Sequence, residues 1–426
     1  MIVGLAFIVL LALLLIGVPA FASIGLVAAG LLLAEGMSLA GIGQVVLDHL
    51  NSSTLTSLPF FIIAAAFLQR GGLATALVDM ALAWLARLPG GLAYVAVLAG
   101  AAFSTLSGSS VATAMAVGTA LMPELERRDY PRAFSLGLLG TTGTLGVMLP
   151  PSMALIIFGL LTGVSVPKLF LAGVVPGLVQ ALLLVIIVAI SARRLKLPAG
   201  PALDRETRVK ATLRGLPALA IAFILFGGIY GGFVTPTEAA AVTALLSILA
   251  SLFIYRGCTA KDVVPVLAEG IANAGRIVMI IASALLLSYW LVLAGIADAL
   301  VHAIKALGLG PIGFLALVSV ILLLLGIVLE GVSSLLIVTP LIWPLICPLG
   351  IDPLHFAIIM VVTIEIGMLH PPLGMNIFVL ASIGKTSTAE VIRGLWPFLG
   401  LMFVLLILVT LIPALSTWLP HHVYQR

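Results

Sequence analysis

Long apolar stretches, separated by short polar or glycine- and proline-containing breaks, run along most of this chain. Uninterrupted stretches lie near residues 2–18, 170–192, 216–232, 237–254, 277–296 and 395–415. Each approaches the length of about 20 apolar residues that a helix needs to cross a bilayer. The pattern predicts an all-α polytopic membrane protein with roughly ten to thirteen passes. The first stretch has no basic start and no small-residue cleavage motif, which favours a retained span over a signal peptide.

Residues 92–122 form an apolar stretch that is interrupted in its middle. About fifteen apolar residues precede the polar run 107–110, and about twelve follow before Pro123. Neither limb is long enough to span alone, which favours a re-entrant helical hairpin with its tip near the bilayer midplane. Such a tip is tolerated where protein or a water-filled cavity covers it. The stretch 312–348 repeats the arrangement, with its polar tip at 330–334.

A proline pair breaks the apolar stretch that follows each hairpin. Residues 133–164 are broken at Pro150-Pro151, and residues 354–383 are broken at Pro371-Pro372. Proline has no backbone N–H and its ring clashes with the preceding turn, so two in succession unwind a helix and free several carbonyl oxygens. A cation is the natural partner for such carbonyls inside a membrane.

The two broken segments belong to a repeat with a spacing of 221 residues, the separation of Pro150 from Pro371. The same spacing joins Pro123 to Pro344, Gly146 to Gly367, Gly173 to Gly394 and Pro176 to Pro397. Matches at one spacing predict two copies of one structural unit, in an N-terminal half (1–192) and a C-terminal half (216–426). Duplicated units with broken helices in an apolar chain are typical of secondary transporters, with the substrate between the breaks.

Composition indicates that lipid, not water, surrounds this chain. Of its 426 residues 62% are hydrophobic and 8% are charged, whereas soluble domains carry about 25% charged residues. The net charge of +4 is small and gives no reason to expect a nucleic-acid partner. The linker 193–215 between the halves is basic, with seven Lys/Arg against two acidic residues, so the positive-inside rule predicts that it is cytoplasmic. Two cysteines indicate neither a disulfide framework nor a metal cluster.

Several runs of sequence resemble the large membrane (permease) subunit of tripartite ATP-independent periplasmic (TRAP) transporters, of the DctM or SiaM type. They are SGSSVATAMAVGTALMP, LGVMLPPSMALIIFG, GVVPGL, GGFVTPTEAAAV and IGMLHPPLGMNIFVL, in family order over nearly the whole chain. The resemblance implies an elevator-type, sodium-driven transporter of the bacterial inner membrane, built of two inverted repeats. It implies no enzymatic activity. It also implies a small four-span membrane subunit (DctQ- or SiaQ-like) and a periplasmic binding protein (DctP- or SiaP-like). The binding protein would deliver an organic acid such as a C4-dicarboxylate or sialic acid.

Two candidate sodium sites pair each hairpin with the break that follows it, because hydroxyls and freed carbonyls are the hard oxygen ligands that sodium prefers. The first site consists of Ser104, Ser107, Gly108, Gly146, Leu149 and Pro151. The alternative for its serines is hydrogen bonding back along their own helices. The second site consists of Gly326, Gly367, His370 and Leu373. His370 stands where the family commonly has threonine and offers no hydroxyl, so its expected contribution is its carbonyl oxygen. Because histidine side chains in general can exchange a proton at physiological pH, proton coupling is an alternative.

Candidate substrate ligands lie where helix N-termini would meet, because their free N–H groups attract anions. They are Ser109, Ser152, Glu330 and Asn376. Glu330, an ionisable residue at the second hairpin tip, is a functional candidate for a cation or a substrate hydroxyl. Its alternative role is to cap the next helix. Thr235 and Glu238 fit a structural capping box.

Three other functions compete with the predicted transporter subunit: a stand-alone sodium/carboxylate symporter, a passive channel and an intramembrane hydrolase. The sequence contains no HExxH motif, and no histidine is obviously placed to activate Ser107, which disfavours the hydrolase. ATP binding is not expected either, because Val379 stands where a phosphate loop ending at Gly384-Lys385 requires glycine. The identity of the organic acid does not follow from the residues.

Overall fold

The computed structural model describes residues 2–51, 53–200, 203–296, 302 and 308–424, and these form helices joined by short connections. The N-terminal half contains α1 (Ile2–Leu15), α2 (Ala20–Ala34), α3 (Leu39–Leu50), α4 (Ser53–Arg70), α5 (Leu73–Leu85), α6 (Gly91–Ser107), α7 (Ser110–Arg127), α8 (Arg132–Met148), α9 (Met153–Thr162) and α10 (Val166–Arg194). The predicted hairpin is the pair α6–α7, and the predicted break separates α8 from α9. The all-α fold class is confirmed.

The C-terminal half repeats the order of hairpin, broken helix and long helix. It contains α11 (Arg205–Tyr230), α12 (Pro236–Leu249) with a π-helical end (Ala250–Ile254), α13 (Ala260–Leu293), α15 (Pro311–Val328), α16 (Gly331–Ile346) with a 3-10 end (Cys347–Leu349), α17 (Pro353–Leu369), α18 (Met375–Gly384), α19 (Thr388–Leu411) and α20 (Ala414–Tyr424). The second hairpin is α15–α16, and the second break separates α17 from α18. The predicted capping box at Thr235 and Glu238 is present at the start of α12.

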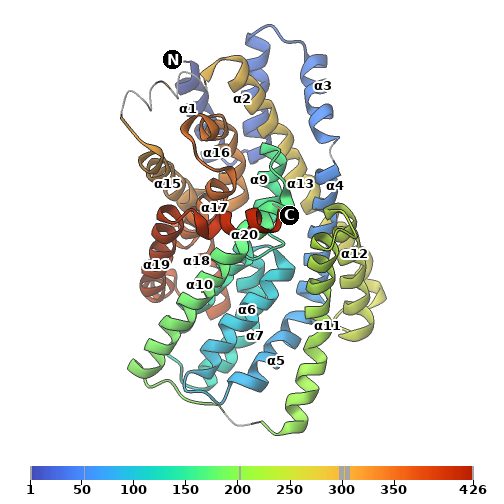
Figure 1. The fold of residues 1–426 in the computed structure, drawn as a ribbon, viewed down its shortest axis with the longest axis vertical. Helices are drawn as coiled ribbons and strands as arrows, with labels where there is room; N and C mark the ends of the chain where they lie inside the picture. The colour runs from blue at the N-terminus through green and yellow to red at the C-terminus, as the bar shows by residue number, and fades with distance from the viewer. Residues whose placement is uncertain (1, 52, 201–202, 297–301, 303–307, 425–426) are drawn as a thin grey trace.

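The two halves keep the predicted register over their broken helices. The helix α17 begins and ends 221 residues after α8, at 353 against 132 and at 369 against 148. Both helices lie in the protein core: every residue of α8 from 135 to 148 and of α17 from 354 to 369 is buried. Figure 1 shows the hairpins α6–α7 and α15–α16 in opposite halves of the molecule along its long axis. The inverted orientation of the repeats and the elevator movement stay predictions.

Fewer helices are able to cross a membrane than the sequence predicted. Among the described residues seven helices are long and apolar enough to cross a bilayer, or eight if α4 and α5, which meet at a 59° bend, form one span. This count is lower than the predicted ten to thirteen passes, and it includes the broken helix α8–α9 and the hairpin helix α16 with its 3-10 end. The predicted span at 2–18 is also shorter, since α1 has 14 residues and Pro19 is already the N-cap of α2.

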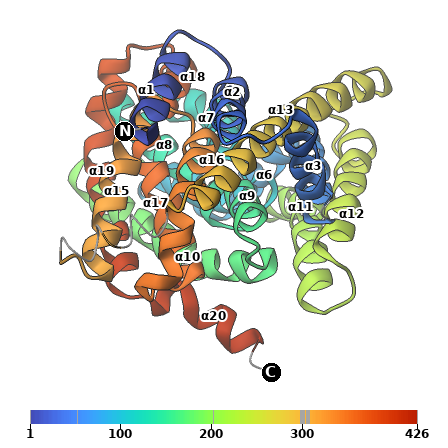
Figure 2. The ribbon, with the colours of Figure 1, turned by 90° about the horizontal axis from the view of Figure 1, so that it is seen from above.

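The outer helices present apolar side chains to their surroundings. Figure 2 shows α11, α12 and α13 on one side of the molecule and α15 and α19 on the other. Phe223 on α11 is 75% exposed, and Leu182 on α10 and Ile407 on α19 are more than half exposed. Contiguous apolar surface of this kind is not stable in water, so a bilayer is its expected solvent. The protein is therefore a multi-pass membrane protein.

The basic linker is shorter than predicted. The prediction placed it at 193–215, but α10 continues to Arg194 and α11 begins at Arg205, so the connection is 195–204. Helix formation extends into the polar segment because Asp204 caps α11, accepting a hydrogen bond from the Thr207 backbone N–H at 3.3 Å. The basic residues that follow therefore lie on the first turns of a helix.

The Asp204 cap gives α11 a pH-dependent first turn. Hydrogen bonds from the Thr207 hydroxyl and N–H hold the pKa of Asp204 below its ordinary value. A lowered pKa stabilises the cap above the ordinary value of about 3.9, and this stabilisation is lost as pH falls through the lowered pKa. We expect hydrogen-exchange protection factors in this turn to fall on acidification in the native protein. They should not change in Asp204→Asn, because asparagine caps without titrating. Equal pH dependence in both proteins would contradict the assignment.

Candidate functional site

The two hairpin tips meet the two central helices around one cavity of about 60 Å³. Its lining comes from the starts of α7, α9 and α16, from the end of α8 and from α17. The lining residues are Gly108, Ser109, Ser110, Val111, Val147, Met153, Ala154, Glu330, Gly331, Val332, Val361, Ile364, Glu365 and Met368. Residues far apart in sequence, from both halves, therefore share one cavity.

The first hairpin tip is closed by its own polar residues. The helix α6 ends at Gly108, whose φ of +61° lies in the left-handed region that glycine adopts without strain. Ser109 then caps α7, accepting a hydrogen bond from the Ala112 N–H at 3.4 Å. Across the tip, the Ser107 and Thr113 hydroxyls are hydrogen-bonded at 2.7 Å. The sequence folds here into a tight, polar turn that is covered by protein.

The structure brings the core of the first predicted sodium site together. The Gly108 carbonyl accepts a hydrogen bond from the Met153 N–H at 3.3 Å. A Cβ added at Gly108 would lie 2.5 Å from the Pro151 carbonyl oxygen, and one added at Gly146 would lie 2.6 Å from the Ser109 carbonyl oxygen. The hairpin tip is therefore in direct contact with the break, and several carbonyl groups are close to one another.

Two other predicted members of the first site make local contacts. The Ser104 hydroxyl donates to the Ala101 carbonyl at 2.6 Å, which is the alternative role considered for it. The Leu149 N–H donates to the Leu145 carbonyl at 2.9 Å, while the Leu149 side chain packs beside Gly177.

The second predicted site is only partly assembled. A Cβ added at Gly367 would lie 2.8 Å from the Gly326 Cα, so α15 and α17 touch backbone to backbone. The His370 carbonyl accepts a hydrogen bond from the Gly374 N–H at 3.1 Å. The Nδ1 of the His370 ring lies 2.6 Å from the Pro371 carbonyl oxygen. Leu373 is 53% exposed. The two glycines are brought together, whereas His370 is engaged within its own turn.

The predicted substrate ligands divide into two groups. Ser109 and Glu330 line the cavity. Glu330 also caps α16, accepting from the Ser333 N–H at 3.4 Å and the Ser333 hydroxyl at 3.3 Å, which is the alternative role considered for it; its binding role stays a prediction. Ser152 and Asn376 are fully buried and do not line the cavity. Ser152 caps α9, and its hydroxyl accepts from the Leu155 N–H at 3.3 Å.

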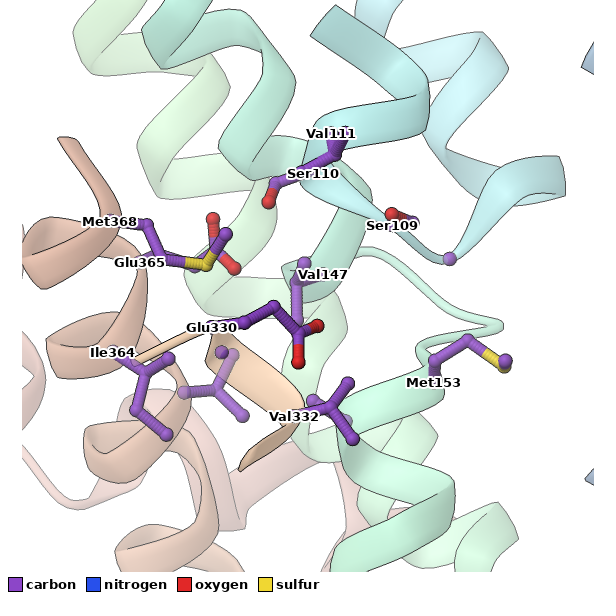
Figure 3. A pocket seen from close by; sticks show the side chains of 14 residues that line it. Ser109, Ser110, Val111, Val147, Met153, Glu330, Val332, Ile364, Glu365 and Met368 are labelled. Atoms are coloured by element: carbon purple, nitrogen blue, oxygen red, sulfur yellow. The ribbon is translucent and has the colours of Figure 1, made fainter. Parts of the chain in front are cut away.

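Two polar residues of the cavity, Ser110 and Glu365, are not among the predicted site residues. The sequence placed Glu365 near the second break, with pairing inside the scaffold as an equal alternative. Figure 3 shows the Ser110 hydroxyl and the Glu365 carboxylate on the same side of the cavity, while the Glu330 carboxylate of the second hairpin lies near Val332. Glu365 is 3% exposed, and it stands in an apolar helix without another charged residue. An ionisable residue in such a helix is a functional candidate by default, and that signal could have identified it.

Electrostatically, the cavity combines three helix N-termini with two carboxylates. The first residues of α7, α9 and α16 all line it, and unpaired N–H groups at a helix start attract anions. Glu330 and Glu365 oppose an anion unless cations accompany it. Within the described residues no group of three or more His, Cys, Asp or Glu could hold a metal ion. A cation here would use carbonyl, hydroxyl, amide or carboxylate oxygens.

Comparison with known proteins identifies relatives over nearly the whole chain. The family described as "Tripartite ATP-independent periplasmic transporter, DctM component" matches residues 7–415. The "C4-dicarboxylate TRAP transporter large permease protein DctM" of Vibrio cholerae is 38% identical and aligns over 99% of this chain and 98% of its own. The protein of the same name from Pseudomonas aeruginosa is 41% identical over 86% of each chain.

A solved structure shares the fold. The Alcanivorax borkumensis YdaH transporter superposes with a TM-score of 0.59, covering 90% of this chain and 91% of that one at 15% identity. At this identity the similarity concerns the fold alone.

Proposed function

The chain belongs to the tripartite ATP-independent periplasmic transporter family as its DctM component, and on that premise we propose that it imports a small organic acid together with sodium. The observation that carries the proposal is the cavity on which three helix N-termini and two carboxylates converge. The N-termini suit the carboxylate groups of an organic acid. The protein carboxylates make that acid's binding dependent on accompanying cations.

Among organic acids, a C4-dicarboxylate fits the cavity better than a sugar acid. The polar side chains that line it are Ser109, Ser110, Glu330 and Glu365. The remaining side chains of the lining are apolar. A sialic acid carries many hydroxyls, each of which would lose its hydrogen bonds to water against such a lining. A four-carbon acid places its charge at two ends and needs few other partners. The names of the relatives from Vibrio cholerae and Pseudomonas aeruginosa agree with this choice.

Sodium is the proposed coupling ion, held where each hairpin meets its break. Ser107, Gly108, Gly146 and Pro151 are the proposed core of the first site, because these residues lie where the hairpin tip contacts α8 and the break. Gly326 and Gly367 are the proposed core of the second. Closing a hairpin tip onto its break would form the site, so ion binding and hairpin closure would depend on each other.

The proposed partners follow from the family. They are a small four-span membrane subunit and a periplasmic binding protein that delivers the acid, with the complex in the bacterial inner membrane. The lipid-facing surfaces of α10, α11 and α19 suit this location. The alternative, a stand-alone symporter, needs no binding protein.

The proposal is tested by uptake of radiolabelled succinate into proteoliposomes that contain this protein and its small subunit. We expect saturable uptake that requires an inward sodium gradient and the added binding protein. Replacing sodium with potassium at equal ionic strength is the control for salt effects. Uptake without the binding protein would favour the stand-alone symporter, and uptake that neither saturates nor needs sodium would favour a channel.

A further inference from the structure

Two buried acceptor oxygens beside the cavity have no hydrogen-bond partner. They are Oε2 of Glu365 and Oδ1 of Asn376. The exposed fractions of the two residues are 3% and 0%. Buried polar atoms in folded proteins almost always have a partner, so these two oxygens require an explanation, most of all the carboxylate oxygen.

Both oxygens belong to residues that contact one hydroxyl, that of Ser110. The Asn376 amide Nδ2 donates to Ser110 Oγ at 3.5 Å. The Ser110 hydroxyl also lies within interaction range of the Glu365 carboxyl group, and both residues line the cavity. The Asn376 amide thus uses its donor end on Ser110, and its oxygen is left over. Three side chains from α7, α17 and α18 therefore converge around Ser110, with two acceptors uncommitted.

Among the described residues, the charged group that acts on Glu365 is another carboxylate and not a cation. The cavity lining contains no lysine or arginine, and the other carboxylate on it, Glu330, is of the same sign. An uncompensated carboxylate is strongly disfavoured in a low-dielectric interior. Hard oxygen donors from a carboxylate, an amide and a hydroxyl are what an alkali cation prefers, whereas transition metals favour imidazole or thiolate ligands. One carboxylate balances one monovalent charge.

We propose that Glu365, Asn376 and Ser110 bind a sodium ion at a site distinct from the two hairpin–break contacts. The adjoining cavity of about 60 Å³ can supply water to complete the coordination shell. Ser110 starts α7 on the first hairpin, while Glu365 and Asn376 flank the second break on α17 and α18. The ion therefore ties one repeat to the other next to the proposed anion site, and it deepens the proposed sodium coupling.

The test counts bound sodium ions by equilibrium binding of sodium-22 to the purified full-length protein, in a potassium background. We expect Glu365→Gln, which keeps the shape and removes the charge, to bind one sodium ion fewer than the native protein. The matched control is Glu206→Gln, which removes a carboxylate that is 73% exposed and paired only with Lys210. The control should bind the native number of ions.

An unchanged sodium count in a folded Glu365→Gln protein overturns the proposal. It would mean that a proton or a water molecule satisfies the carboxylate instead. If Glu365→Gln does not fold, Asn376→Asp provides the second test. The added carboxylate should tighten sodium binding about tenfold. An unchanged sodium affinity of Asn376→Asp overturns the proposal. A native protein that binds no sodium at all would contradict the proposed coupling as well. Sodium-independent uptake with one ion lost in Glu365→Gln would contradict the coupling alone.

Discussion

Replacing Gly108 with alanine should reduce sodium-dependent uptake by about a hundredfold, the loss expected when a binding geometry is displaced by about 1 Å. The added Cβ would lie 2.5 Å from the Pro151 carbonyl oxygen. That atom is backbone, so either the hairpin tip or the break must move. Both supply proposed ligands of the first sodium site, and they would separate. The measurement is initial succinate uptake at several sodium concentrations, with the sodium requirement shifted to higher concentration in the variant.

Gly163→Ala is the matched control for Gly108→Ala. Gly163 also has a positive φ, +73°, but a Cβ there meets nothing within 4 Å. Both substitutions carry the conformational cost of a left-handed alanine, about 1–2 kcal/mol, and only Gly108→Ala adds the collision. We expect similar losses of stability from the conformational term, and a large loss of uptake in Gly108→Ala alone. Equal uptake in the two variants would show that the tip–break contact is not part of the sodium site.

The hairpins and breaks could be predicted because their signals are local in sequence. Proline pairs at 150–151 and 371–372 end a helix wherever they occur, and a polar run inside an apolar stretch indicates a turn in any fold. The 221-residue spacing then extended each local signal to a second copy. The structure places helix ends where these signals lie, with α8 ending at Met148 and α17 at Leu369.

Contacts between distant segments could not be predicted in the same way. The neighbours of Asn376 are Ser110 and, through it, Glu365, which lie on three different helices. No spacing in the sequence encodes that meeting, so Asn376 was assigned to the substrate and Glu365 was assigned to neither a sodium site nor the substrate site. The repeat also did not predict the hydrogen bonding of His370. The His370 carbonyl accepts a hydrogen bond from the Gly374 N–H within its own turn. Equivalent positions in two copies need not have equivalent free oxygens.

The N-terminal region shows a different reason for missed elements. The helices α2 and α3 are 15 and 12 residues long, shorter than a span. A search for stretches of about 20 apolar residues therefore passes over them. Ile24 and Leu32 on α2 are fully buried, within a small cluster that includes Trp290 of α13. These helices are held by packing against α13, which no local pattern reveals.

Replacing Gly367 with alanine should destabilise the folded protein by about 1–3 kcal/mol, the range for overpacking a tight interior contact. The added Cβ would lie 2.8 Å from the Gly326 Cα, where neither helix has a flexible side chain that can move aside. The helices α15 and α17 must separate, which also opens the second proposed sodium site. The measurement is thermal unfolding of the purified protein in potassium chloride and in sodium chloride. We expect a lower unfolding temperature in potassium and a smaller rise on adding sodium.

Gly326→Ala and the double variant make this prediction specific to one contact. A Cβ on Gly326 would lie 3.0 Å from the Gly367 Cα, so either substitution alone separates the same two backbones. Substitutions that disturb one shared contact are not additive, and the second should therefore cost less once the first has moved the helices apart. Gly400→Ala on α19, where a Cβ meets nothing within 4 Å, is the control and should not lower stability. Additive losses from Gly326 and Gly367 would mean that the two glycines act through separate neighbours, and the α15–α17 contact would lose its assigned role in the second sodium site.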